Sequence, residues 1–360
     1  MKIFLFTGVM LMLVFTLACK GTDTGNYIQY KSLSRFTDPG DFSSMLDKLP
    51  DDVIGICEIA KQQMIHHNLL PYYGIPKSKW KEMNNIWPPR MNDLLEALKD
   101  TEPHNLYDQR KPEQRIIGSC MKESHLLAGM LRYKNIPVRI RAGFFKDIRA
   151  NSAHVIKFWE KVSKEKGSEA ELLEKDPVKW KEVNNAYTKK QNDVNHYIEH
   201  WICEYWDKNQ EKWRLLDANN TFLKAHSDID VGFHLPKKHF EYACEAWKKM
   251  RRNDHFNPDQ YAEGQKDGRS HIRTYLLWDF YSLLNHDIAG YDQQSRSSLQ
   301  FINERKYEEI STLELEELDM LANLLAQDPT KDEIAAFYRR CKTLRLESVE
   351  KDPYSFVFSK

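Results

Sequence analysis

The feature that most constrains the fold is a pair of short aromatic segments, residues 200–206 and 213–217, separated by a polar turn. Aromatic and β-branched runs bounded by such a turn are typical of an antiparallel hairpin. A tight turn between the segments would put Asp217 opposite Ile202 and make His200 its diagonal neighbour on the same face. The chain is therefore expected to contain an antiparallel sheet. A shift of one residue in this register would separate the two polar side chains.

A helix followed by a strand precedes this hairpin along the chain. Residues 119–134 carry apolar side chains at helical spacing, with Ser119 as the expected N-cap. Residues 138–142 then alternate apolar and basic side chains, which predicts a strand with Arg139 and Arg141 on a solvated face. Together with the hairpin, these elements predict an α+β fold.

The chain divides into five expected regions. They are a signal peptide (1–18), a tether (19–50), an N-terminal helical region (51–112), a core (113–290) with a charged insertion (157–195), and a C-terminal helical region (291–360). Helical spacing from residue 51 to about 70 would leave His66 and His67 on the surface. Capping boxes predict that C-terminal helices begin after Ser311 and Thr330.

The composition excludes several classes of protein. The charges of the 53 basic and 53 acidic residues cancel, and the sequence has no block of basic residues. Nucleic acid is therefore not an expected partner, because its binding needs clustered positive charge. With 41% hydrophobic residues, the chain can bury a core and is not expected to be disordered. No two cysteines have C-x-x-C spacing, so a zinc site is not expected. Without Cys19 five cysteines remain, and at least one of them must stay unpaired.

The N-terminus predicts export. Lys2 is followed by an apolar stretch, residues 3–18, that is shorter than the roughly 20 residues of a membrane-spanning helix. Residues 16–19, TLAC, resemble a bacterial lipobox, although Thr16 stands where that pattern prefers Leu. The resemblance implies cleavage before Cys19 and its acylation, which would place the protein in the cell envelope with a lipid as its only membrane contact. A plain secretory signal is the alternative.

Three residues form a candidate catalytic set. Cys120 lies at a helix N-terminus, where unpaired N–H groups favour a thiolate and should depress the pKa of the thiol. His200 and Asp217 would face each other across the hairpin. A carboxylate that holds the imidazole Nδ1–H would leave Nε2 to take a proton from the thiol. The backbone N–H of Cys120 is the expected oxyanion donor.

The run GSCMKESHLLAGMLRYKNIPVR, residues 118–139, resembles the cysteine helix and following strand of the transglutaminase-like family. Asn135 stands where that family usually has Gly, and Asn also tolerates a left-handed helix end. The spacing from His200 to Glu204, followed by WRLLD ending at Asp217, is similar to the family's histidine and aspartate strands. The resemblance implies a papain-like α+β core with the order Cys, His, Asp. The charged insertion is the chain's main departure from it.

The same resemblance implies a function. It indicates an exported, cysteine-dependent amide hydrolase or acyltransferase that acts on peptide or protein substrates through a thioester, without a cofactor. Hydrolysis is favoured because water outside the cell competes with an amine acceptor. The alternative is a non-catalytic lipoprotein that uses the same fold to bind a peptide or a glycan. The sequence does not indicate an oligomeric state.

Several assignments stay open at this stage. His196 and His154 are alternative bases. Glu204 and Trp201 are candidate substrate-binding residues, with a structural role for the first and hairpin packing for the second as alternatives. The insertion, residues 157–195, should cover one side of the cleft and select substrate, unless it is only a surface excursion.

The anchoring hypothesis makes a direct prediction. If Cys19 is acylated, the mature protein should partition into detergent, and its N-terminal peptide should carry the mass of the lipid in mass spectrometry. Cys19→Ala should shift the protein to the aqueous phase. Recovery of wild-type protein with an unmodified Cys19, or with its N-terminus beyond that residue, would instead demonstrate a plain signal peptide.

Overall fold

The protein is described by a computed structural model. It describes residues 27–70, 73–83, 90–145, 197–221, 224, 231–253, 255–261, 267–285, 302 and 305–346. The expected signal peptide, Cys19 and the charged insertion 157–195 lie outside these residues. Within them, no helix is both long enough and apolar enough to cross a membrane.

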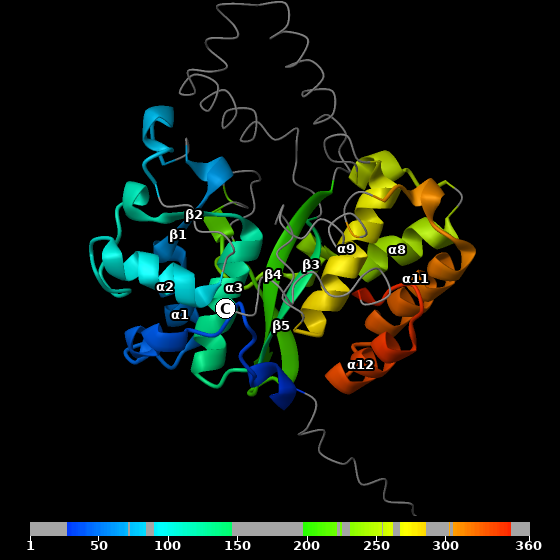
Figure 1. Cartoon of the computed structure of the whole chain (residues 1–360), viewed down its shortest axis with the longest axis horizontal. Helices are drawn as coiled ribbons and strands as arrows, with labels where there is room; N and C mark the ends of the chain where they lie inside the picture. Colours follow the sequence, from blue (N-terminus) through cyan, green and yellow to red (C-terminus); the bar gives the residue numbers. More distant parts are fainter. Residues whose placement is uncertain are drawn as a thin grey trace, which may run out of the picture.

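An antiparallel sheet with the strand order β5-β4-β3-β6 runs through the centre of the described part of the molecule (Figure 1). Its strands are β3 (Val138–Phe145), β4 (Ile198–Asp207), β5 (Lys212–Leu216) and β6 (Phe240–Tyr242). In the hairpin, Cys203 pairs with Leu216. Continuing this register by one pair puts Asp217 opposite Ile202. The predicted hairpin, its register and the α+β class are confirmed.

Helix α3 (Cys120–Tyr133) packs against β4 and is buried along nearly its whole length. It is followed by Asn135 in the left-handed backbone region, with φ of 59°, a conformation that Asn tolerates better than most side chains. The predicted helix is confirmed. Ser119 occupies the N-cap position as predicted, but its hydroxyl makes no capping hydrogen bond.

Helices α1 (Val53–Gln63) and α2 (Met91–Asp100) pack against α3. The helix predicted as far as residue 70 ends at Gln63, and the chain continues as β1 (Met64–His66), parallel to β2 (Ile116–Gly118). The prediction failed here because the partner strand is distant in the sequence and leaves no local periodic signal. His66 is consequently buried, contrary to expectation, and its ring stacks on His67 with centroids 4.4 Å apart.

Residues 27–50 are not a tether, which corrects the expectation for this part of the 19–50 segment. They form η1 (Ile28–Lys31) and η2 (Gly40–Leu46), and the side chains of Tyr30 and Phe36 are fully buried. Polar composition suggested an extended linker, yet a few large apolar side chains are enough to hold the segment against the core.

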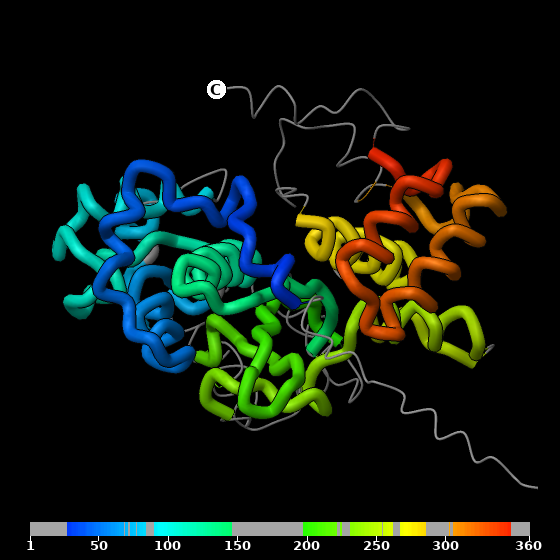
Figure 2. The backbone as a smooth tube through the Cα atoms, turned by 90° about the horizontal axis from the view of Figure 1, so that it is seen from below, coloured from blue at the N-terminus to red at the C-terminus, as the bar shows by residue number. Residues whose placement is uncertain are grey.

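The other side of the sheet is covered by helices from the C-terminal half of the chain (Figure 2). Helices α8 (Ala243–Arg252) and α9 (Gly268–Leu283) contact its strands, and α11 (Thr312–Leu325) and α12 (Lys331–Arg340) pack against these helices in turn. Short 3₁₀ helices complete the described elements: η3 (His67–Leu69), η4 (Lys77–Lys79), η5 (Pro112–Gln114), η6 (Lys237–His239), η7 (Pro258–Tyr261) and η9 (Tyr307–Glu309). The side chains of Ser311 and Thr330 cap α11 and α12, as predicted. The main hydrophobic core includes residues from Tyr30 to Leu346, so the described parts of the four regions expected after the signal peptide share one core.

Arg110 organises the loop after α2 from inside the protein. Its side chain is fully buried. The guanidinium donates to the carbonyl oxygens of Leu98, Thr101, Glu102, Pro103 and Asn105 and to the Gln63 side chain, at 2.8–3.0 Å. One planar cation therefore satisfies carbonyl groups that no regular element would pair.

Arg110→Met should lower the free energy of unfolding by about 3 kcal/mol or more, because it leaves several buried acceptors without a donor. Urea denaturation at neutral pH would measure this. Arg251→Met is the matched control, since Arg251 pairs with Asp319 at the surface and should change stability by less than about 1 kcal/mol. Equal effects from the two substitutions would contradict the structural role given to Arg110.

Candidate active site

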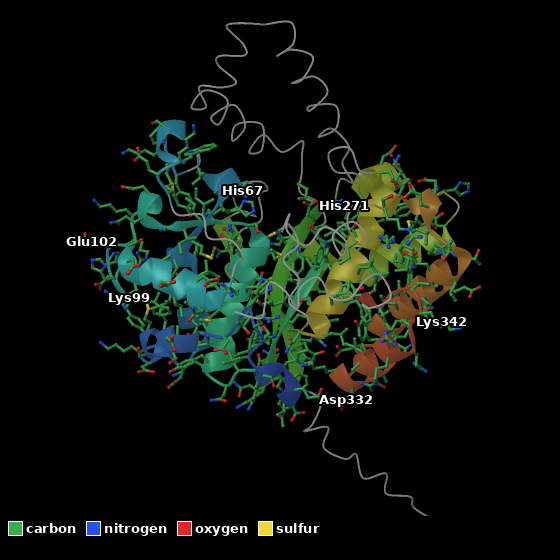
Figure 3. All side chains as sticks on the ribbon, viewed as in Figure 1. His67, Lys99, Glu102, His271, Asp332 and Lys342 are labelled. Atoms are coloured by element: carbon green, nitrogen blue, oxygen red, sulfur yellow. The ribbon has the colours of Figure 1, made fainter. Side chains whose placement is uncertain are left out.

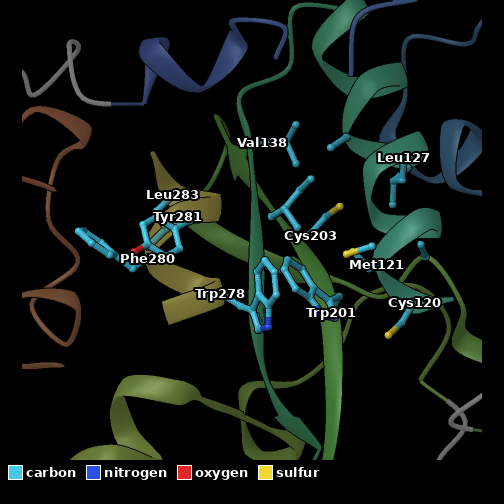
Figure 4. Packing of buried hydrophobic residues seen from close by; sticks show 14 of the residues in the cluster. Cys120, Met121, Leu127, Val138, Trp201, Cys203, Trp278, Phe280, Tyr281 and Leu283 are labelled. Atoms are coloured by element: carbon cyan, nitrogen blue, oxygen red, sulfur yellow. The ribbon is translucent and has the colours of Figure 1, made fainter. Parts of the chain in front are cut away.

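Cys120 is the first residue of α3 and lies beside strand β4. Its side chain points off the end of the helix toward the strand that carries Trp201 (Figure 4). The backbone N–H of Trp201 faces the sulfur and acts to lower the pKa of the thiol. Strand β5 stops at Leu216, so it does not pair with β4 at Trp201. The thiol therefore lies beside Trp201, the residue that follows His200, on the part of the β4 edge that β5 does not cover.

His200 and Asp217 meet as the hairpin register requires. Nε2 of His200 lies 3.2 Å from Oδ1 of Asp217, and both side chains are almost fully buried. The imidazole also stacks on Phe145, with ring centroids 4.0 Å apart. The expected contact is made by the other ring nitrogen: Asp217 contacts Nε2 of the imidazole rather than Nδ1.

The loop after β5 holds Asp217 in place. Its backbone N–H donates to the carbonyl of Phe233, and its Oδ1 accepts a hydrogen bond from the backbone N–H of Asn219, both at 2.9 Å. Its Oδ2 is buried and has no hydrogen-bond partner in the structure. The carboxylate is thus oriented toward His200 through one oxygen.

The pKa of the Cys120 thiol differs from the sequence-based expectation. Burial raises the pKa above its ordinary value, and the N–H of Trp201 only partly opposes this effect. The negative charges of Glu123, Glu199 and Asp217 raise it further. The predicted depression was wrong for the protein in this conformation, because the helix terminus acts here on a thiol removed from water.

Glu199 and His271 flank the site on the side of α9. Oε2 of Glu199 lies 3.0 Å from Nε2 of His271. In Figure 3, His271 is seen on the α9 side of the sheet and His67 on the side of α1 and α3. Glu199, the residue before His200, therefore lies against α9.

Glu204 is part of a buried charge cluster, which contradicts its assignment as a substrate-binding residue. Its Oε2 accepts from Arg139 at 2.7 Å and from Arg141 at 2.9 Å, and its Oε1 accepts from the hydroxyl of Tyr242. Arg141 also pairs with Asp279 of α9 at 2.8 Å. Both oxygens of Glu204 are therefore occupied inside the protein.

The two arginines are not on a solvated strand face, as the alternation in β3 had indicated. Arg139 and Arg141 are each 4% exposed. The alternation correctly predicted the strand, but α9 and Glu204 supply the countercharges that allow this basic face to be buried.

Trp201 contributes its backbone rather than a substrate-binding side chain. Its ring is 3% exposed and packs beside Trp278, with centroids 6.0 Å apart. The substrate-binding assignment is corrected to hairpin packing. The alternative bases His154 and His196 lie outside the described residues.

Sequence reasoning missed two residues beside the triad, Glu123 and Asn219. Oε1 of Glu123 accepts a hydrogen bond from Nδ2 of Asn219 at 3.0 Å. Their spacing offered a signal, because Glu123 lies one helical turn after Cys120 and Asn219 lies two residues after Asp217.

The remaining cysteines are structural in their surroundings. Cys57, Cys203, Cys244 and Cys341 are all buried and unpaired, and Cys120 is also free. The prediction of at least one unpaired thiol is confirmed. Within the described residues, no cluster of three or more His, Cys, Asp or Glu side chains could hold a metal ion.

Comparisons with known proteins returned no family model, no curated protein and no solved structure that matches this chain. The class of the fold as α+β therefore rests on the elements described above, and the site rests on its geometry.

The charge cluster predicts an acid-sensitive contribution to stability. Burial alone would raise the pKa of Glu204, but Arg139 and Arg141 outweigh it and lower the pKa to about 2, from 4.5. The ionised carboxylate therefore stabilises the fold fully above pH 4.5, and this contribution is lost as the pH falls toward 2. Glu204→Gln should destabilise the protein by about 3–5 kcal/mol at pH 7, because it leaves two buried cations without their shared anion.

Urea denaturation at pH 7, 4.5 and 3 would test this, and the gap between wild type and variant should narrow at pH 3. Glu82→Gln is the control, since Glu82 forms an exposed pair with Lys79 and should have little effect at any of these pH values. A gap that stays constant with pH would show that Glu204 does not act through its charge.

Proposed function

We propose that this chain is an exported, cysteine-dependent amide hydrolase or acyltransferase with a papain-like, transglutaminase-like core. Two observations carry the proposal. Asp217 contacts the imidazole of His200, and the thiol of Cys120 lies beside the backbone N–H of Trp201, the residue that follows His200 on β4. The motif in residues 118–139 supports the same assignment.

In the proposed reaction, Sγ of Cys120 attacks the carbonyl carbon of an amide in a peptide or protein. The thiol proton passes to Nδ1 of His200, because Nε2 faces Asp217. Since burial disfavours a free thiolate, we expect proton transfer to accompany the attack. The carbon–nitrogen bond then breaks, and His200 gives its proton to the departing amine. A thioester on Cys120 remains.

The second half of the reaction releases the acyl group. Water, or an amine in the acyl-transfer variant, loses a proton to His200 and attacks the thioester, and the sulfur regains a proton as its bond to carbon breaks. Hydrolysis is the favoured outcome outside the cell, where water is abundant. The N–H of Cys120, at the first position of α3, has no acceptor within its own helix and is suited to stabilise the oxyanion.

A second candidate function is peptide or glycan binding without catalysis. It is favoured by the state of the thiol: Cys120 is only 8% exposed, and burial raises its pKa. In both cases, we propose that the protein reaches the cell envelope through its N-terminal signal and is anchored by lipid on Cys19.

Alkylation and acylation of Cys120 separate the two functions. An active enzyme should label with iodoacetamide at Cys120 at pH 8 faster than at its other thiols, and should form a mass-detectable thioester with an activated peptide ester. His200→Ala and Asp217→Asn should slow acylation by roughly 10²–10⁴-fold, because they remove the base or its orientation.

Cys120→Ser should abolish the adduct, while Cys341→Ser should leave it unchanged. Equal labelling of all five thiols, or acylation that does not depend on His200, would rule out the catalytic proposal and favour the binding protein.

A further inference from the structure

Glu123 links α3 to the aspartate of the candidate site through Asn219. The amide of Asn219 donates to Oε1 of Glu123 at 3.0 Å, and the backbone N–H of Asn219 donates to Oδ1 of Asp217 at 2.9 Å. That same oxygen of Asp217 contacts His200. A continuous chain of polar contacts therefore runs from the cysteine helix to the histidine.

The second oxygen of Glu123 has no such support. Oε2 is buried without a hydrogen-bond partner, and the residue is only 7% exposed. It borders a small, partly open cavity of about 10 Å³, with Asn219 and Ala218 among the lining residues. A cavity of this size holds about one water at most, so it cannot hydrate an ionised carboxylate.

Charged and titratable groups face Glu123 from several elements. They are Lys61 on α1, His66 on β1, Tyr73, Arg115 before β2, and Asp217 after β5. Lys61 donates to Asn220 at 2.6 Å, and Arg115 lies over the ring of Tyr73. Burial raises the pKa of Glu123 to about 8, outweighing the hydrogen bond from Asn219 and the cations Lys61 and Arg115.

We propose that Glu123 is a positioning residue. As a neutral carboxyl it holds the Asp217 loop through Asn219, and when it ionises, its charge suppresses formation of the thiolate of Cys120. The proposal deepens the function above and rests on it. Two requirements favour this arrangement: the loop needs an acceptor for the Asn219 amide, and the thiol needs that acceptor to carry no charge.

The direction of the effect follows from the charges. Of the charged groups that act on Cys120, Glu123 has the largest effect, and its negative charge raises the pKa of the thiol. Below pH 8 Glu123 is protonated and adds no such charge. Above pH 8 it ionises, so the thiolate becomes harder to form over the pH range in which thiols ordinarily ionise.

Alkylation rates of Cys120 across pH 6 to 9.5 would test this in wild type, Glu123→Gln and Glu123→Ala, with peptide mass spectrometry as the readout. Gln keeps the acceptor for Asn219 and has no charge at any pH. The rate ratio of Glu123→Gln to wild type should be near one at pH 6 and should rise, with a midpoint near pH 8, to at least roughly threefold. Glu123→Ala should be slower than Glu123→Gln throughout.

Glu113→Gln is the matched control, because Glu113 is exposed and its ratio to wild type should stay flat. A flat ratio for Glu123→Gln, or equal rates for the Gln and Ala variants, would overturn the proposal. A ¹³C NMR titration of carboxyl-labelled glutamates, assigned by difference from Glu123→Gln, gives a readout independent of catalysis. A titration midpoint near pH 8 supports the inference, and a midpoint near pH 4.5 overturns it. This result does not depend on the reactivity of Cys120: an unreactive Cys120 would contradict the proposed function alone.

Discussion

The pairing of β4 with β5 is the constraint on which the candidate site depends. The register of Cys203 with Leu216 puts Asp217 opposite Ile202, within reach of His200. Because β5 ends there, the N–H of Trp201 is left for the sulfur of Cys120 instead of another strand. A shift of one residue would turn His200 to the other face of the sheet and remove the contact with Asp217.

The sequence predicted the elements whose formation depends on residues that are neighbours in the chain. The hairpin, the cysteine helix, the left-handed Asn135 and the caps at Ser311 and Thr330 were all predictable, because turn chemistry and periodicity act over a few residues. Failures occurred where a distant element changes the surroundings. Arg139 looked solvated because nothing nearby in the sequence identifies its buried partner, Glu204. The contact between Glu123 and Asn219 likewise spans 96 positions: their spacing from Cys120 and Asp217 puts each residue near the site, but no local pattern pairs the two with each other.

The two buried glutamates show that burial does not by itself set the state of a carboxyl group. Glu204 has two guanidinium groups on one oxygen, and its pKa falls to about 2. Glu123 accepts from one neutral amide on one oxygen, its other oxygen is buried without a hydrogen-bond partner, and its pKa rises to about 8. Countercharge decides which form a buried carboxyl takes. The ionised Glu204 joins β3 to β4, whereas Glu123 lies on α3 one turn after Cys120, the candidate nucleophile.

Selectivity among the thiols cannot come from exposure alone. Cys120 is 8% exposed, Cys341 is 5% exposed, and burial raises the pKa of both. What distinguishes Cys120 is its place: it is the first residue of α3, and it lies beside Trp201, the residue that follows His200 on β4. In the proposed reaction, the helix terminus and the N–H of Trp201 would stabilise the thiolate as its proton leaves, which would let a buried thiol react when a carbonyl group reaches it.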